Sequence, residues 1–223
     1  MTRNLFIQAV TKFSLGIILV GLLIFLPAGT CSYFNGWLFM GVLFIPMTVL
    51  GIVLMWKSPE LLKKRLDAKE KQKDQDLVVK LSGLMFLTGF LAAGFGVRFG
   101  WYLLPKSTAI GSAAIFLLSY ALYAEVLREN EYLSRTIEVQ ENQRVVDTGL
   151  YGIVRHPMYS ATILMFLTIP LMLGSIYSFL IFLAYPFIIA RRIKGEEEFL
   201  EKELIGYAEY KKKVRYRLIP FVW

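Results

Sequence analysis

The sequence contains few of the residues that stabilise small secreted proteins or bind metal ions. Its 223 residues include one cysteine, Cys31, and one histidine, His156. A single cysteine excludes a disulfide within the chain and a cysteine-rich zinc site. Any imidazole chemistry must use His156, and we predict no metal site.

Charged residues are also scarce. They make up 19% of the chain, against 56% hydrophobic residues, whereas soluble domains average about 25% charged and about 45–50% apolar. This balance argues against a soluble protein, and also against disorder, which requires low hydrophobicity. The net charge of +8 is not accompanied by a basic surface interleaved with stacking aromatics, so we expect no nucleic-acid partner.

Long apolar runs dominate the chain. A helix that crosses an apolar layer of about 30 Å needs roughly 20 apolar residues, and four runs approach this length, at 13–27, 37–56, 81–97 and 108–126. A fifth, 158–190, is too long for one helix and is interrupted near its middle by Pro170, Gly174 and Ser175. We interpret it as a short helical hairpin that is tilted or partly re-entrant. The predicted fold is an all-α polytopic membrane protein with about six transmembrane helices.

The distribution of basic residues predicts which side of the membrane each loop faces. Of the 25 lysines and arginines, only Arg98 and Lys106 lie outside the amino-terminal end and the segments 57–80, 128–155 and 191–217. Cytoplasmic loops collect Lys and Arg, so we predict a multi-pass protein of the cell inner membrane or the endoplasmic reticulum, with both termini cytoplasmic. The first run also resembles a signal peptide, but we expect this helix to be retained.

Two polar segments are predicted to lie between the apolar runs. Ser58, Pro59 and Glu60 suit the start of a helix, which would lie on the membrane surface through Leu61, Leu62 and Leu66. Residues 69–76 would then be a solvated linker. In the second polar segment, 127–157, alternating residues 136–146 around Glu141-Asn142 predict a small β-hairpin.

An anion-binding pocket is expected where the helical hairpin begins and ends. Pro157 suits the first turn of a helix, whose unpaired N–H groups bind anions. Because the hairpin returns the chain to the same side, Arg155 and His156 should lie near Glu196 and Glu197. Glu125 and Asn130 at the end of the fourth run either line this pocket or cap the helix.

Beyond the hairpin, aromatic and aliphatic residues predict a helix against the bilayer, formed by Phe199, Leu200, Leu204, Tyr207 and Tyr210. An extended basic and aromatic tail follows at 214–220. Gly94-Phe95-Gly96 is interpreted as a site of helix packing. No Gly-x-Gly-x-x-Gly motif occurs, so the Rossmann fold is not expected.

The second half of the chain, residues 129–223, resembles the isoprenylcysteine carboxyl methyltransferase family. The resemblance is carried by Glu129-Asn130, Ser134, Val146-Asp147-Thr148-Gly149, Tyr151, Arg155-His156-Pro157-Met158-Tyr159, Glu196-Glu197, Leu200, Gly206-Tyr207, Tyr210 and Arg217-Leu218-Ile219-Pro220. The Arg-His-Pro-x-Tyr element with a Glu-Glu pair is shared with phospholipid N-methyltransferases, so it indicates the cofactor better than the acceptor. We divide the single structural domain into helices at 1–128, with a loop at 57–80, and a methyltransferase-like region at 129–223.

This resemblance implies that S-adenosylmethionine binds at the cytoplasmic face under a carboxyl-terminal lid, while a lipid-modified acceptor arrives from the bilayer. Arg155 and His156 would hold the cofactor carboxylate. Glu196 and Glu197 would hold its ammonium group or ribose hydroxyls. Tyr151 and Tyr159 would contact the adenine or the carboxylate. Arg155, His156 and Glu197 are the implied catalytic residues.

Several functions remain open at this stage. The first is a membrane S-adenosylmethionine-dependent methyltransferase that O-methylates a carboxyl group on a lipid-like or isoprenylated acceptor. The second is a phospholipid amine N-methyltransferase, in which His156 or a glutamate would accept the amine proton. The third is a sterol-type reductase that uses NADPH, and the fourth is a structural membrane protein without catalytic activity. The sequence does not indicate an oligomeric state.

Overall fold

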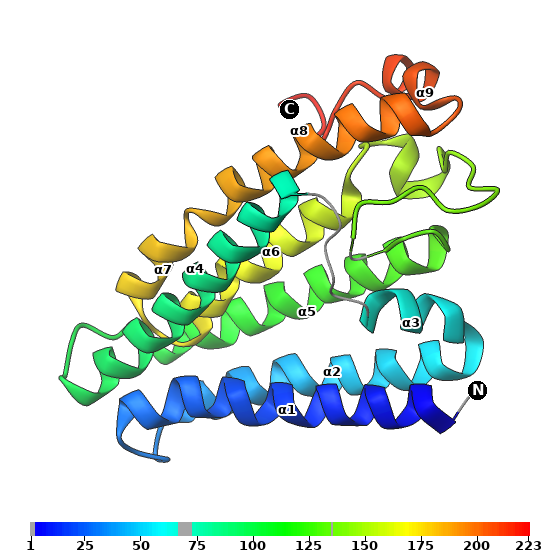
Figure 1. Ribbon diagram of the computed structural model, residues 1–223. Coiled ribbons are helices and arrows are strands. Elements are labelled where there is room, and N and C mark those ends of the chain that lie inside the picture. The colour runs from blue at the N-terminus through cyan, green and yellow to red at the C-terminus, as the bar shows by residue number, and fades with distance from the viewer. Residues whose placement is uncertain (1–2, 67–72, 135) are drawn as a thin grey trace.

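The computed structural model describes residues 3–66, 73–134 and 136–223, and within these ranges it is helical and has no β-strand. Figure 1 shows its four longest helices, α1 (Arg3–Ala28), α2 (Phe34–Lys57), α4 (Lys73–Arg98) and α5 (Lys106–Glu129). Each contains a stretch long and apolar enough to cross a membrane. The predicted all-α polytopic membrane fold is confirmed.

The last apolar run forms the predicted helical hairpin. Its first arm is α6 (Pro157–Met172), and its second arm consists of α7 (Ile176–Phe182) and α8 (Tyr185–Glu203). The turn contains Gly174, whose φ of 75° is a left-handed conformation that glycine adopts readily. The two arms differ in length: the segment Ile176–Glu203 has the length of a span, whereas α6 is shorter. Within the described residues, the predicted count of about six helices thus corresponds to five candidate spans and this shorter helix.

The helix connections lie at two ends of the bundle. The α4–α5 connection meets the hairpin turn, because the Leu104 amide donates to the Gly174 carbonyl oxygen at 2.8 Å. Figure 1 shows these connections at one end and α3 (Pro59–Leu66), α9 (Tyr207–Lys213) and the amino terminus toward the other. Arg98 and Lys106 are at the first end, apart from the three basic segments. The cytoplasmic placement of the termini stays a prediction.

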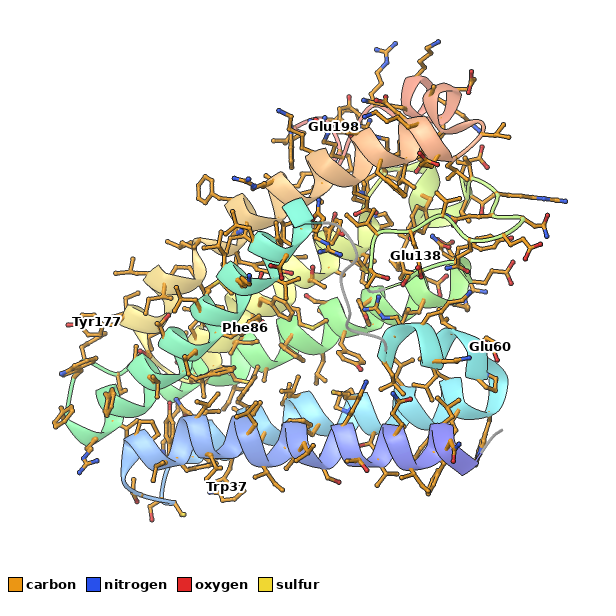
Figure 2. The ribbon with its side chains drawn as sticks, in the orientation of Figure 1. Trp37, Glu60, Phe86, Glu138, Tyr177 and Glu198 are labelled. Atoms are coloured by element: carbon orange, nitrogen blue, oxygen red, sulfur yellow. The ribbon has the colours of Figure 1, made fainter. Side chains whose placement is uncertain are left out.

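The core lies between α4, α5 and the hairpin. Phe86 of α4, labelled in Figure 2, makes edge contacts with Phe166 of α6 and Phe182 of α7, at ring-centroid distances of 4.9 and 5.3 Å. The outer faces of α1 and α2 are apolar as well: Leu26 is 71% exposed and Trp56 is 79% exposed. Such a continuous apolar exterior is suited to lipid rather than water.

Gly94 confirms the interpretation of its segment as a helix-packing site. A Cβ atom at this position of α4 would lie 2.7 Å from the Ile24 carbonyl oxygen and 2.8 Å from the Pro27 Cβ atom of α1. The backbones of α1 and α4 therefore approach each other at a point where no side chain fits.

The first polar segment differs from its prediction in two respects. The helix α3 forms, but Leu61 and Leu62 are buried, so the protein rather than the bilayer covers its apolar face. Residues 73–76 are not a linker because they form the first turn of α4, where Gln75 is buried against Gly195 of α8. Residues 69–72 of the predicted linker lie outside the described residues.

The predicted β-hairpin at 136–146 is wrong for the residues that the structure describes, which form no strand there. A turn does form: the Gln143 amide donates to the Gln140 carbonyl oxygen at 3.1 Å, and Asn142 has a φ of 58°. Side chains take the place of a strand ladder, since the Gln140 side-chain amide donates to the Tyr132 carbonyl oxygen at 2.7 Å. Local side-chain bonds of this kind compete with strand pairing.

The predicted helix against the bilayer beyond the hairpin is also corrected. The chain leaves the helical conformation after Glu203, and Gly206 has a φ of 87° before α9 begins. Leu204, Tyr207 and Tyr210 are buried and pack with Val214, Val139, Val145 and Leu200. We call this set the cover cluster. It faces the second polar segment, which removes these side chains from contact with lipid.

Candidate functional site

A cavity of about 100 Å³ lies where the second polar segment meets α6, α8 and α9. Its walls combine apolar, aromatic and charged side chains from five parts of the chain. They include Asn130, Ser134, Glu138, Val145, Tyr151, Arg155, His156, Met158, Tyr159, Arg192, Glu196, Leu200, Tyr207 and Tyr210. Figure 2 shows Glu138, on the segment between α5 and α6, and Glu198, on α8, at the same end of the molecule.

Glu197 is the centre of a buried ion cluster behind this cavity. Its side chain is 2% exposed. One oxygen, Oε1, accepts from Arg155 Nε at 2.8 Å and lies 3.2 Å from His156 Nε2. The other, Oε2, accepts from Arg217 Nε at 3.0 Å and Nη2 at 2.8 Å. The predicted meeting of the basic and acidic groups across the hairpin is confirmed.

Arg155 connects this cluster to the segment after α9. Its Nη1 donates to the carbonyl oxygens of Val214 and Arg215 at 2.7 and 2.8 Å. The backbone follows the same route: the amides of Arg155 and His156 donate to the carbonyl oxygens of Tyr216 and Arg217, both at 2.9 Å. Most of the Arg155 donors are therefore used inside the protein, which makes this guanidinium a clamp that holds the predicted extended tail in place.

A second polar group faces the cavity directly. The Tyr159 hydroxyl donates to Glu196 Oε2 at 2.6 Å and accepts from Arg192 Nε at 2.8 Å. Arg192 is not among the site residues predicted from the sequence. The spacing of Arg192 and Glu196 could have indicated it, because residues four apart on a helix share one face.

Tyr151 lies on a short 3-10 turn, η1 (Gly149–Gly152). Its hydroxyl accepts from Asn130 Nδ2 at 3.0 Å, and its carbonyl oxygen accepts from the Tyr210 hydroxyl at 2.8 Å. Burial raises the pKa of the Tyr151 phenol well above its usual value, so the hydroxyl keeps its proton. Of the two open assignments, Asn130 lines the cavity, whereas Glu125 pairs with Arg128 at the surface.

Gly149 and Glu129 fix the position of η1. The Leu150 amide donates to Glu129 Oε2 at 2.9 Å. Gly149 has a φ of 51°, and a Cβ atom there would lie 1.4 Å from Glu129 Oε1. A residue with a side chain does not fit at this contact, which explains the glycine at position 149.

Hydrogen bonds from α3 also hold the second polar segment in place. Arg65 Nη1 donates to the Ser134 carbonyl oxygen at 3.1 Å, and Nη2 bonds to the Tyr123 hydroxyl. Lys64 Nζ donates to the Glu131 carbonyl oxygen at 3.2 Å and to Gln140 Oε1. These contacts join segments more than 55 residues apart and are not among the features predicted from the sequence.

We predict that Arg65→Ala loosens the second polar segment without unfolding the bundle. The substitution removes the bonds to Ser134 and Tyr123 at a partly exposed position, so we expect a loss of about 1–2 kcal/mol in stability. Limited trypsin digestion of the detergent-solubilised protein should cut at Arg144 faster than in the wild type. Lys63→Ala, at an exposed position of the same helix, is the control, and equal cleavage of both variants would contradict the prediction.

Most of the predicted site residues line one cavity. Tyr151, Arg155, His156, Tyr159 and Glu196 are all in its walls. Glu197 is not, because it lies behind the wall formed by its cationic partners. The functional roles assigned to these residues stay predictions.

Two comparisons with known proteins match parts of the chain. Residues 107–205 match the family of phospholipid methyltransferases, which confirms the resemblance to membrane methyltransferases over residues 129–205 and adds α5 to the matching region. A delta(14)-sterol reductase of Mus musculus is 30% identical over 91 residues, which are 40% of this chain. The chain matches only 22% of that reductase's length.

Proposed function

We propose that this integral membrane protein is a methyltransferase that transfers a methyl group from S-adenosylmethionine to a lipid-like acceptor. The observation that carries the proposal is the position of the cavity. Its walls are formed largely by the region that matches the phospholipid methyltransferases, and the apolar helix α6 begins beside it. A polar donor and an apolar acceptor can therefore meet at one end of the bundle.

The side chains in the cavity walls match this methyl donor in charge and hydrogen-bonding capacity. S-adenosylmethionine supplies an activated methyl group on a positively charged sulfonium. The carboxylates of Glu138 and Glu196 in the walls favour positive charge, and so do the faces of the tyrosine rings. Hydroxyl and amide side chains from Asn130 and Ser134 match ribose hydroxyls in hydrogen-bonding capacity. We assign Glu197 a positioning role, since it orients Arg155 and His156.

The protein contributes alignment and the exclusion of water. Tyr151, His156 and Tyr159, which line the cavity, are each less than 8% exposed. A dry site favours a reaction in which the sulfonium charge disappears. Holding two reactants in line removes much of the entropic barrier to a displacement.

For the acceptor, we propose a carboxyl group on a lipid-like or isoprenylated molecule. A carboxylate is already ionised at neutral pH and needs no general base. The alternative acceptor is a phospholipid amine, which the name of the matching family favours. An amine must lose a proton, and Glu196 in the cavity wall is placed to accept it. The second alternative, a sterol-type reductase that uses NADPH, is favoured by the partial match to the mouse enzyme.

The test is transfer of a labelled methyl group from S-adenosylmethionine into membrane lipids and proteins. We expect the wild type to label an extractable lipid-like product. A methyl ester would release its label in mild base, whereas an N-methyl group would retain it. Absence of label together with binding of NADPH would contradict the proposal in favour of a reductase.

We predict that Glu196→Gln lowers methyl transfer about tenfold or more. The neutral amide would lose the charge-assisted bond that the Glu196 carboxylate is proposed to make to the methyl donor, and such a bond contributes about 1.5–3 kcal/mol. The glutamine still accepts the Tyr159 hydrogen bond, so the fold is retained. Initial rates of label incorporation would measure the effect. Glu198→Gln, at an exposed position two residues further along α8, is the matched control and should label at the wild-type rate. Equal rates for the two variants would remove Glu196 from the site.

A further inference from the structure

The cavity wall contains a hydroxyl group that the protein itself does not use. Tyr207 lines the cavity and is 4% exposed. Its hydroxyl oxygen is buried and has no hydrogen-bond partner among the residues that the structure describes. Buried hydroxyl groups nearly always have a partner, so an exception requires an explanation.

Tyr210, on the same helix, has a hydroxyl group with a hydrogen-bond partner in the protein. Tyr210 belongs to the same cover cluster, and its ring centroid is 5.7 Å from that of Tyr207. The Tyr210 hydroxyl donates to the Tyr151 carbonyl oxygen at 2.8 Å. The two phenols are similarly buried, yet only one of them is bonded to the protein.

The nearby carboxylates are already occupied. Both oxygens of Glu197 accept bonds from Arg155 and Arg217, and Glu196 accepts one from Tyr159. Burial raises the pKa of the Tyr207 phenol, and the negative charges of Glu197 and Glu196 raise it further. The hydroxyl therefore keeps its proton and is a donor that lacks an acceptor.

We propose that Tyr207 is a ligand-binding residue whose hydroxyl donates a hydrogen bond to an acceptor atom of the methyl donor in the cavity. This inference rests on the proposed function. It assigns α9 a role in ligand binding, because Tyr207 is the first residue of this helix, which covers the cavity. Gly206, with a φ of 87°, is the joint from which α9 begins.

The test compares Tyr207→Phe with Tyr210→Phe in the full-length protein purified in detergent. Binding of S-adenosylhomocysteine is measured by calorimetry, and thermal unfolding is measured without ligand. We expect Tyr207→Phe to raise the Kd about threefold to tenfold, the worth of one neutral hydrogen bond. Its Tm without ligand should be unchanged or higher, because an unsatisfied hydroxyl is removed. Tyr210→Phe should lower the Tm, because a bond within the protein is lost.

A second ligand locates the acceptor atom. 5′-Methylthioadenosine lacks the amino-acid part of the donor. An equal loss of affinity for both ligands places the bond on the nucleoside, and a loss for S-adenosylhomocysteine alone places it on the amino-acid part. Either result supports the inference.

Two results would overturn the inference while leaving the proposed function intact. One is an unchanged Kd of Tyr207→Phe for S-adenosylhomocysteine when the wild type binds it. The other is a Tm that falls as far as in Tyr210→Phe, which would show that the hydroxyl has a partner within the protein. Failure of the wild type to bind S-adenosylhomocysteine would instead overturn the proposed function, and the inference with it.

Discussion

Glu197→Ala is expected to destabilise the protein by about 3–5 kcal/mol, the usual cost of removing one partner from a buried ion pair. The reason is the number of groups that depend on this carboxylate. The Arg155 side chain is 4% exposed, so without Glu197 its positive charge would stay buried and lack a counter-ion. Arg217 and His156 would lose the same partner. The segment after α9 would lose part of its attachment to α8, because Arg217 bonds to Glu197.

Thermal unfolding in detergent would measure this loss as a decrease in Tm on the order of 10 °C, given the size of the chain. Glu198→Ala is the control, because the neighbouring glutamate is exposed and such surface substitutions usually change stability by less than about 0.5 kcal/mol. Glu197→Gln should fall between the two, since it keeps the shape and loses the charge. A Tm for Glu197→Ala equal to that of the control would show that the cluster does not stabilise the fold.

The second large effect is expected at Gly94. Gly94→Ala places a Cβ atom within 2.8 Å of the α1 atoms Ile24 O and Pro27 Cβ. Overpacking costs typically about 1–3 kcal/mol, and we expect the upper part of this range because Ile24 O is a backbone atom that cannot rotate away. The helices α1 and α4 would have to move apart.

Gly83→Ala offers a matched control on the same helix. A Cβ atom at Gly83 meets no other atom within 4 Å. Alanine is favoured over glycine in a helix by about 1 kcal/mol, so this variant should be as stable as the wild type or more stable. Thermal unfolding of both variants measures the difference. Similar Tm values for the two would mean that α1 and α4 are not in close contact at Gly94.

The hairpin and the ion cluster could be predicted from the sequence because their causes are local. Pro170 and Gly174 interrupt a long apolar run, and an apolar run that turns once must bring its two ends to the same side of the membrane. The charged residues at those ends, Arg155 and Glu197, are then brought close together. Their meeting follows from chain geometry without knowledge of the rest of the fold.

The contacts that shape the cavity could not be predicted, because they depend on segments far apart in sequence. Arg65 reaches Ser134 across 69 residues, and the Tyr210 hydroxyl reaches Tyr151 across 59. The alternation of residues 136–146 indicates strands only if no side chain competes for the backbone groups. Here Gln140 and Gln143 do so, and the segment turns without forming a ladder.

The bonds from Arg155 to Val214 and Arg215 also set an order of assembly during synthesis. A nascent chain stalled after α8 contains both arms of the hairpin but none of the carbonyl groups that this guanidinium requires. The contacts that attach residues 214–217 to Arg155 and His156 can therefore form only after the ribosome has released this last segment.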